Sequence, residues 1–219
     1  MEKHLVICIG RQFGSGGREI GLGLAKKLGI RFYDKEILKK AAEESGIVEE
    51  LFEKADEKPT NSFLYSLSMG THGQAMNFTN YNDYLTNDKL FLFQSNTIRD
   101  MAEKDSCVII GRCADYILRG RKDMLSVFIH APMELRIQRI SRVRNVEEDA
   151  ARSLIKKTDR QRANYYNFYA DNDWGAADSY DVAINSGKLG VEKSIEVLAG
   201  ICEHLSIAAT TAWQKPCGF

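Results

Sequence analysis

The feature that most constrains the fold is an apolar run followed by a glycine-rich loop and a helical pattern near the N-terminus. Residues 6–29 read VICIGRQFGSGGREIGLGLAKKLG. The branched apolar start is typical of a strand buried on both faces. Ile20, Leu24 and Leu28 then recur every four residues before Gly29, which favours a helix with a glycine C-cap. Such a unit suits an anion, because the loop amides and the helix N-terminus both present partial positive charge.

The same alternation of short apolar runs and helical patterns continues along the chain. Strands separated by helices predict an α/β fold, doubly wound around a parallel sheet. We predict strands at 4–10, 31–34, 106–112, 125–132 and 179–187, and helices at 18–29, 35–46, 88–104, 133–170 and 191–205.

We treat residues 1–219 as a single domain. Two segments within it differ from this regular pattern. Residues 59–88 are polar, aromatic and almost uncharged, and they have no sustained period. We interpret them as an insertion over a ligand, a plain surface excursion being the alternative. Residues 133–165 are helical and rich in arginine, which fits a lid that closes guanidinium groups over phosphates. An ordinary solvated helix surface explains the same pattern.

Composition excludes several classes of function. The 30 basic and 30 acidic residues cancel, so no global charge attracts nucleic acid or an anionic membrane. The five cysteines form no CxxC pair or metal-ligand spacing, which suits a reducing cytoplasm. No apolar run approaches the roughly 20 residues of a membrane span. We therefore expect a cytoplasmic protein with a small-molecule partner.

The glycine loop differs from the P-loop motif GxxxxGK[ST] at two chemically important positions. When the motif is aligned with residues 11–18, Gly16 is its second glycine, but Gly17 replaces the lysine and Arg18 the hydroxyl residue. A cation for the β- and γ-phosphates and a hydroxyl for Mg²⁺ are thus missing. Arg18 and Arg11 are the candidate replacements for the charge, although a guanidinium is a planar fork and not a point charge. A loop that only joins strand to helix remains the alternative.

Three further positions are candidates for ligand contacts. Arg112 follows a strand-like run, and ligands of open parallel sheets bind where the strands end; an ordinary surface arginine is the alternative. Asp159 and Arg162 share a helix face, so they would pair or jointly bind a ligand.

Several stretches together resemble the cytidylate kinase-like family of P-loop proteins, over about residues 6–198. The resemblance implies a three-layer P-loop NTPase fold with a five-stranded parallel sheet, an NMP-binding insertion and a lid. It also implies transfer of a phosphoryl group from ATP, with Mg²⁺, to a nucleoside monophosphate. The stretches that carry it are ICIGRQFGSGGREIGLGLAKKLGIRFYDKEIL, CVIIGRCADYIL, VFIHAPMELRIQRI, TDRQRANYYNFY and SYDVAINSGKLG.

The resemblance also assigns roles to individual residues. Asp34 falls where the family places an aspartate near the acceptor phosphate and the metal. Arg112 matches the arginine of a Gly-Arg-Asp motif, and Asp159 with Arg162 matches an Asp-x-x-Arg that contacts the acceptor. Arg136, Arg139 and Arg142 lie near the start of the lid. The expected donor-phosphate residues are Phe13, Gly14, Ser15, Gly16, Gly17, Arg18 and Glu19; the expected catalytic residues are Arg18, Asp34, Arg112 and Arg139.

The chain departs from the family pattern after Arg112, where Cys113 replaces the aspartate that contributes to base selectivity. Asp115 is the candidate substitute. Three functions therefore stay open: a kinase of CMP or a related acceptor, a nucleotide-binding sensor without transfer activity, and a kinase of a non-nucleotide acceptor.

Overall fold

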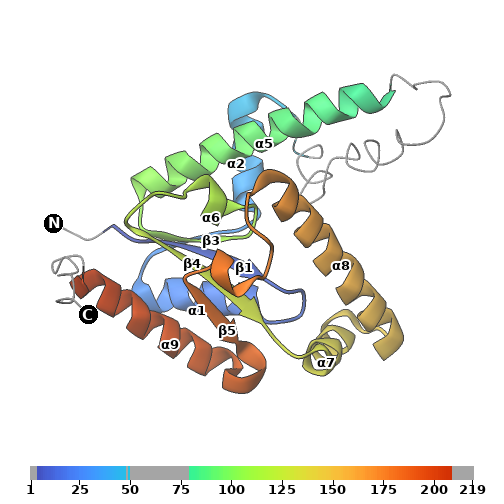
Figure 1. Cartoon of the computed structure of the whole chain (residues 1–219), viewed down its shortest axis with the longest axis vertical. Helices are drawn as coiled ribbons and strands as arrows, with labels where there is room; N and C mark the ends of the chain where they lie inside the picture. Colours follow the sequence, from blue (N-terminus) through green and yellow to red (C-terminus); the bar gives the residue numbers. More distant parts are fainter. Residues whose placement is uncertain (1–3, 48, 50–78, 209–219) are drawn as a thin grey trace, which may run out of the picture.

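The computed structural model describes residues 4–47, 49 and 79–208, and its strands form one parallel sheet in the order β2-β3-β1-β4-β5 (Figure 1). The strands are β1 (Val6–Arg11), β2 (Arg31–Tyr33), β3 (Cys107–Ile110), β4 (Met124–His130) and β5 (Val182–Asn185). The helices are α1 (Gly17–Leu28), α2 (Glu36–Ser45), α5 (Thr79–Lys104), α6 (Ala114–Ile117), α7 (Met133–Arg144), α8 (Glu148–Tyr169) and α9 (Ser186–Ala208), with the 3-10 turn η1 (Ala177–Ser179) before β5.

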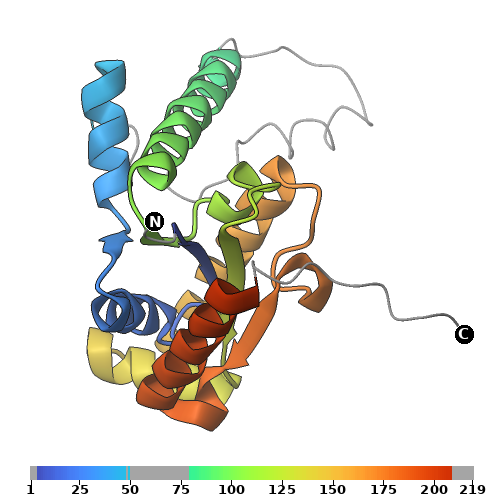
Figure 2. The same cartoon turned by 90° about the vertical axis from the view of Figure 1, so that its left-hand side faces the viewer.

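The sheet is covered on both faces, which explains why its strands are apolar throughout. In β1, Ile7 and Ile9 point into a core shared with α1 and α9. Val6 and Cys8 point the opposite way, into a core shared with α5, α6 and the end of α8. Figures 1 and 2 show these helices on opposite sides of the sheet, with α2 beside α5. The predicted three-layer fold with a five-stranded parallel sheet is confirmed.

The strand order reverses direction at β1, and this positions the candidate site. β1 lies between β3 and β4, so the chain passes from β1 to one edge of the sheet and later returns to β1's other side. In open parallel sheets, a ligand crevice forms at such a point, outside the carboxyl ends of the strands. The glycine loop directly follows β1 at this edge.

The element boundaries agree with the sequence where a local signal exists. Gly29 and Gly46 end α1 and α2 in left-handed conformations, at φ of 68° and 69°, as predicted for C-cap glycines. The predicted single helix at 133–170 is wrong, because it is divided at Asn145, which has a φ of 52° and caps α7. Within the part of the chain that the structure describes, no helix is long and apolar enough to cross a membrane.

The segment at 59–88 is described only from Thr79 onward, and residues 59–78 lie outside the described residues. α5 begins at Thr79 and not at 88, because its first turns lack the apolar periodicity on which the prediction depended. Whether residues 59–78 form an NMP-binding insertion therefore remains a prediction.

Candidate active site

The loop between β1 and α1 has the backbone of an anion-binding turn. Gly14 and Gly16 adopt left-handed conformations, with φ of 83° and 81°, which glycine adopts without strain. Gly16 is the N-cap of α1, so the unpaired amides of the first helical turn open toward the loop. The Ser15 hydroxyl donates to the carbonyl of Gln12 at 2.8 Å and tightens the turn. The backbone can therefore receive phosphate oxygens without any lysine.

Packing leaves no room for a side chain at the position of the absent lysine. A Cβ atom built on Gly17 would lie 2.6 Å from the Cβ of Arg11 and 3.3 Å from that of Ile129. Carbon atoms that are not bonded do not approach so closely, and both neighbours are strand residues at the end of β1 and β4. The glycine is thus a steric requirement of this loop, and the charge must come from elsewhere.

Helices α7 and α8 hold the loop by its backbone. Both oxygens of the Asp159 carboxylate are used: Oδ1 accepts from the amide of Phe13 at 2.7 Å, and Oδ2 accepts from Nη1 of Arg136 at 2.5 Å. The same Nη1 donates to the Phe13 carbonyl at 3.3 Å, and Arg162 donates to the carbonyl of Arg11 at 3.2 Å. Asp159 and Arg162 therefore both contact the loop backbone, and Arg136 is 5% exposed.

Apolar packing supports this arrangement. The Phe13 ring packs against a cluster formed by Ile137, Ile140, Ala151 and Ile155 of α7 and α8. Since the loop and the two helices share this cluster, the base of the predicted lid is part of the loop's support.

Arg139 approaches the loop from α7. A Cβ atom on Gly16 would lie 3.0 to 3.3 Å from Nη1, Cζ and Nη2 of Arg139, so the guanidinium lies directly against that glycine. In the structure the guanidinium forms an ion pair with Glu19, in the first turn of α1. Arg139 therefore places positive charge at the loop.

Arg18, in contrast, points toward the end of β2. Its Nε donates to Oδ2 of Asp34 at 2.7 Å, while Nη1 of Arg112 donates to Oδ1 at 3.3 Å. Asp34 and Arg112 are 7% and 2% exposed, whereas the Arg18 side chain is 63% exposed. The structure thus brings together Arg18, Asp34 and Arg112, which the sequence suggested separately.

Backbone strain accompanies Arg112. Gly111, Arg112 and Cys113 have consecutive positive φ angles of 70°, 58° and 55°. Left-handed conformations are costly for residues with a Cβ, and they persist where the surrounding structure imposes them, often at functional sites. Here the turn carries the buried guanidinium to the carboxyl ends of β2 and β3.

Behind Arg112 lies a small cavity lined by a carboxylate and aromatic rings. Asp115 accepts a hydrogen bond from the Tyr166 hydroxyl at 2.6 Å, and burial raises the pKa of both groups. The volume is about 20 Å³, which suits water and not a nucleobase. Tyr165 and Tyr166 of α8 are buried in the core. The lining includes Arg112, Asp115, Arg162, Tyr166, Trp174 and Tyr180.

A larger cleft of about 290 Å³ adjoins the other side of the loop. Gly14 and Ser15 line one end, Arg139 and Arg142 line the α7 side, and the start of α9 completes it. The Ser186 hydroxyl donates to the carbonyl of Ser15 at 2.6 Å and joins the loop to α9. Ser186 was not among the predicted site residues, and its signal in the sequence is a hydroxyl residue directly after the last strand.

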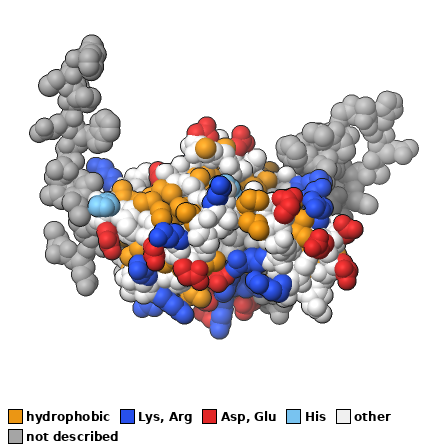
Figure 3. Space-filling model, turned by 90° about the horizontal axis from the view of Figure 1, so that it is seen from below, with side chains coloured by type: hydrophobic (Ala, Val, Ile, Leu, Met, Phe, Trp, Pro, Cys, Tyr) orange, Lys and Arg blue, Asp and Glu red, His pale blue; other side chains and the backbone are white. Residues whose placement is uncertain are grey.

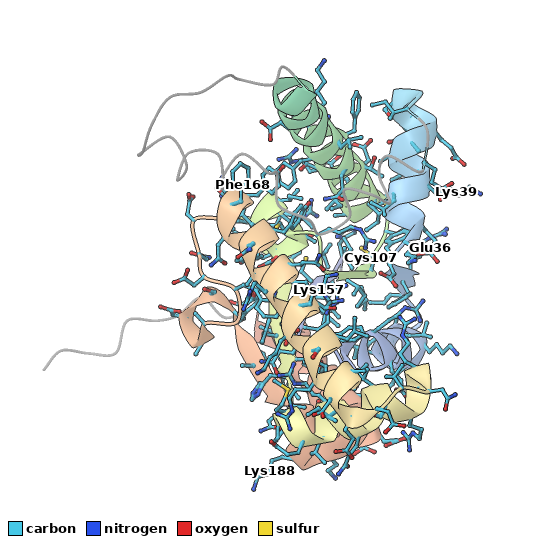
Figure 4. The ribbon with its side chains drawn as sticks, turned by 90° about the vertical axis from the view of Figure 1, so that its right-hand side faces the viewer. Glu36, Lys39, Cys107, Lys157, Phe168 and Lys188 are labelled. Carbon is cyan, nitrogen blue, oxygen red and sulfur yellow. The ribbon has the colours of Figure 1, made fainter. Side chains whose placement is uncertain are left out.

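Helix α8 connects the two sides of the site. Figure 4 shows it crossing the molecule, with Lys157 near its middle and Phe168 at the end beside α5. There Tyr169 stacks on Phe91 of α5 with ring centroids 3.8 Å apart. On the face seen from below, basic and acidic side chains are interspersed (Figure 3).

The loop fits a polyphosphate, since it offers left-handed glycines, a helix N-terminus and the Arg139 guanidinium. The residues fit Mg²⁺ less directly, because each Asp34 oxygen already accepts from a guanidinium. Within residues 4–47, 49 and 79–208, no three His, Cys, Asp or Glu side chains are grouped to hold a metal ion. Mg²⁺ is often held mainly by phosphates and water, and only that mode suits this site.

The sheet order and the glycine loop after β1 define the class: an α/β protein with the fold of P-loop kinases. The chain belongs to the cytidylate kinase-like family, which its residues 6–188 match. The cytidylate kinase of Methanopyrus kandleri is 21% identical over 210 residues, 92% of this chain and 94% of that protein. That of Methanocaldococcus jannaschii is 28% identical over 109 residues, 48% of this chain and 61% of that protein, so this match spans about three fifths of the relative.

Solved structures agree with this fold. An uncharacterized protein from Eubacterium ventriosum is 29% identical, with a TM-score of 0.67 over 91% of this chain and 99% of that one. The shikimate kinase of Bacteroides thetaiotaomicron, 17% identical, has a TM-score of 0.52 over 91% and 98% of the two chains. The latter likeness concerns the fold alone. Together with the family, these comparisons support a kinase of a nucleotide or another small molecule.

Proposed function

We propose that the protein transfers the γ-phosphoryl group of ATP to a nucleoside monophosphate, with CMP as the first candidate. Membership of the family and the names of the two archaeal relatives support the acceptor class. The donor's phosphates bind the backbone of residues 13–19, where the amides and the Arg139 side chain neutralise charge. The acceptor's phosphate binds at Arg112 and Arg18. This division follows from the two separate positions of the guanidinium groups at the sheet edge.

The observation that carries this proposal is the double hydrogen bonding of Asp34. A hydroxyl acceptor needs a base to take its proton, and Asp34 is the buried carboxylate at this edge. Arg18 and Arg112 each donate to one of its oxygens, so the carboxylate holds two guanidinium groups, and these suit an anionic acceptor. A phosphate acceptor needs no base, since its attacking oxygen is already anionic. The geometry therefore favours a phosphate over an alcohol, and Asp34 orients the two arginines.

In the reaction, the bond from the γ-phosphorus to the β,γ-bridging oxygen breaks while an acceptor phosphate oxygen bonds to that phosphorus. The products are ADP and a nucleoside diphosphate. Bound Mg²⁺ would add charge neutralisation on the donor phosphates. The protein's part is alignment and preorganised positive charge, supplied by the loop amides and the arginines. Closure of the α7–α8 region over the ligands would exclude water and limit ATP hydrolysis.

The test is ADP formation by the purified protein with ATP, Mg²⁺ and single acceptors: CMP, dCMP, UMP, AMP, GMP, shikimate or gluconate. We expect ADP formation that depends on a monophosphate and is fastest with one of them. Activity with shikimate or gluconate alone would contradict the acceptor class.

A nucleotide-binding sensor without transfer activity is the second candidate. The packing at Gly17 favours it, because the loop has no place for the lysine on which this class of catalyst usually depends. Tight ATP binding without acceptor-dependent ADP formation would establish the sensor. Cys113, which stands where the family pattern has an aspartate, favours a third candidate, a kinase of a non-nucleotide acceptor.

A further inference from the structure

The ion pair between Glu19 and Arg139 joins two parts of the candidate donor site. Glu19 lies in the first turn of α1, directly after the loop, and Arg139 comes from α7. The pair brings a carboxylate to the guanidinium that lies against Gly16. A carboxylate is the anion most like a phosphate that a protein can supply from its own side chains, and both bind guanidinium through paired oxygens.

Arg139 is held in this position by its own helix. Arg136, one turn earlier on α7, is fixed by Asp159 and by the Phe13 carbonyl. Gly14 lies against the Cβ and carbonyl of Arg136, and Gly16 against the Arg139 guanidinium. Two successive turns of α7 thus contact two glycines of the loop, so the guanidinium can reach the phosphates without a large movement of the helix.

Arg18 is placed differently, although it is closer to the loop in sequence. Its Nε donates to Asp34 at the end of β2, and its Cζ lies 5.7 Å from the centre of the Phe32 ring. Its charge is directed to the acceptor side. Proximity in sequence predicted Arg18 as the replacement for the lysine, but the guanidinium that contacts Gly16 belongs to Arg139.

We propose that Glu19 is an internal competitor of the donor: it holds Arg139 over the loop when no polyphosphate is bound and yields it to the β- and γ-phosphates. Arg139 then takes the charge role of the absent lysine. The side chains of Glu19 and Arg139 are 59% and 29% exposed, so the pair is a weak one that a polyanion also bound by backbone amides can displace. This inference rests on the proposed function, since it assigns residues within its donor site.

The experiment measures binding of inorganic tripolyphosphate and of ATP by titration calorimetry, without any acceptor. Glu19→Gln removes the competing charge, and we expect it to tighten tripolyphosphate binding up to about fivefold. Arg139→Ala should weaken binding about tenfold or more, as expected for loss of charged hydrogen bonds. In the Glu19→Gln/Arg139→Ala double variant, the gain from Glu19→Gln should disappear, because the two effects share one guanidinium.

Glu134→Gln and Arg144→Ala are matched controls, since both are exposed residues of α7 with the same charges. They should change binding less than twofold. Circular dichroism and thermal melting establish that Arg139→Ala is folded, and Glu19→Gln tests the proposal independently of that variant.

Two outcomes overturn the inference while leaving the kinase proposal intact: Glu19→Gln binding no tighter than the wild type, or its gain persisting in the double variant. Absence of tripolyphosphate binding by the wild type also overturns it. Conversely, tighter binding by Glu19→Gln in a protein with no acceptor-dependent ADP formation supports the inference and contradicts the kinase proposal.

Discussion

The carboxylate of Asp159 is shared between the Arg136 guanidinium, 2.5 Å away, and the backbone amide of Phe13, 2.7 Å away. One residue of α8 thus fixes both a buried charge of α7 and the glycine loop. The loop's shape therefore depends on contacts made more than a hundred residues later in the chain.

Asp159→Ala should lower the free energy of unfolding by about 3 kcal/mol, because it leaves the Arg136 guanidinium buried without its carboxylate. Chemical denaturation monitored by circular dichroism measures this change. Asp178→Ala is the control, as Asp178 is exposed in η1, and it should alter stability by less than about 0.5 kcal/mol. Equal effects of the two variants would show that the Asp159 contacts contribute little.

Restoring the lysine should fail. Gly17→Lys, and already Gly17→Ala, should destabilise the protein by about 1–3 kcal/mol, because the added Cβ would lie 2.6 Å from that of Arg11. Gly200→Ala is the matched control: Gly200 lies in α9, and a Cβ there meets no atom within 4 Å. The free energy of unfolding of that variant should rise by about 0.5–1 kcal/mol, because alanine is more favourable than glycine in a helix interior. Denaturation midpoints compare the two, and a stable Gly17→Ala would contradict the steric argument.

The sequence predicted the fold well because its signals are local. Ile7, Ile9 and their neighbours make apolar runs, and Gly29 and Gly46 end α1 and α2 in left-handed conformations. The division at Asn145 was not predicted, although the acidic residues Glu147, Glu148 and Asp149 that follow it are typical of the start of a new helix.

The partners within the site could not be predicted from local pattern. Arg18 follows the loop, so proximity in sequence suggested a donor role, but the first turn of α1 directs it to Asp34. Arg139 is 120 residues from Glu19, and only the packing of α7 on the loop brings them together. Which guanidinium faces which phosphate is thus a property of tertiary packing.

Asp115 should make stability depend on pH. Burial raises its pKa in the folded protein above the ordinary value of 3.8, so its contribution is fully present below that pH and is lost as the pH rises. Asp115→Asn removes the ionisation and can still accept from the Tyr166 hydroxyl. We expect this variant to gain stability relative to the wild type between pH 4 and pH 7, in denaturation series at several pH values. Asp178→Asn, at an exposed position, should show the same pH dependence of stability as the wild type. If the stability difference between Asp115→Asn and the wild type were the same at every pH, the pH dependence would not come from Asp115.

Arg18→Ala separates acceptor from donor binding. Because Arg18 donates to Asp34 beside Arg112, its loss should raise the KM for the monophosphate or lower kcat, with kcat/KM falling about 10- to 100-fold. Calorimetric binding of tripolyphosphate should change less than about twofold, since the guanidinium at Gly16 belongs to Arg139. Arg31→Ala is the control, as Arg31 is an exposed residue of β2 that pairs with Asp105, and it should leave both quantities unchanged. If Arg18→Ala instead abolishes tripolyphosphate binding and spares the KM for the acceptor, Arg18 serves the donor and the division of charge proposed for this site is wrong.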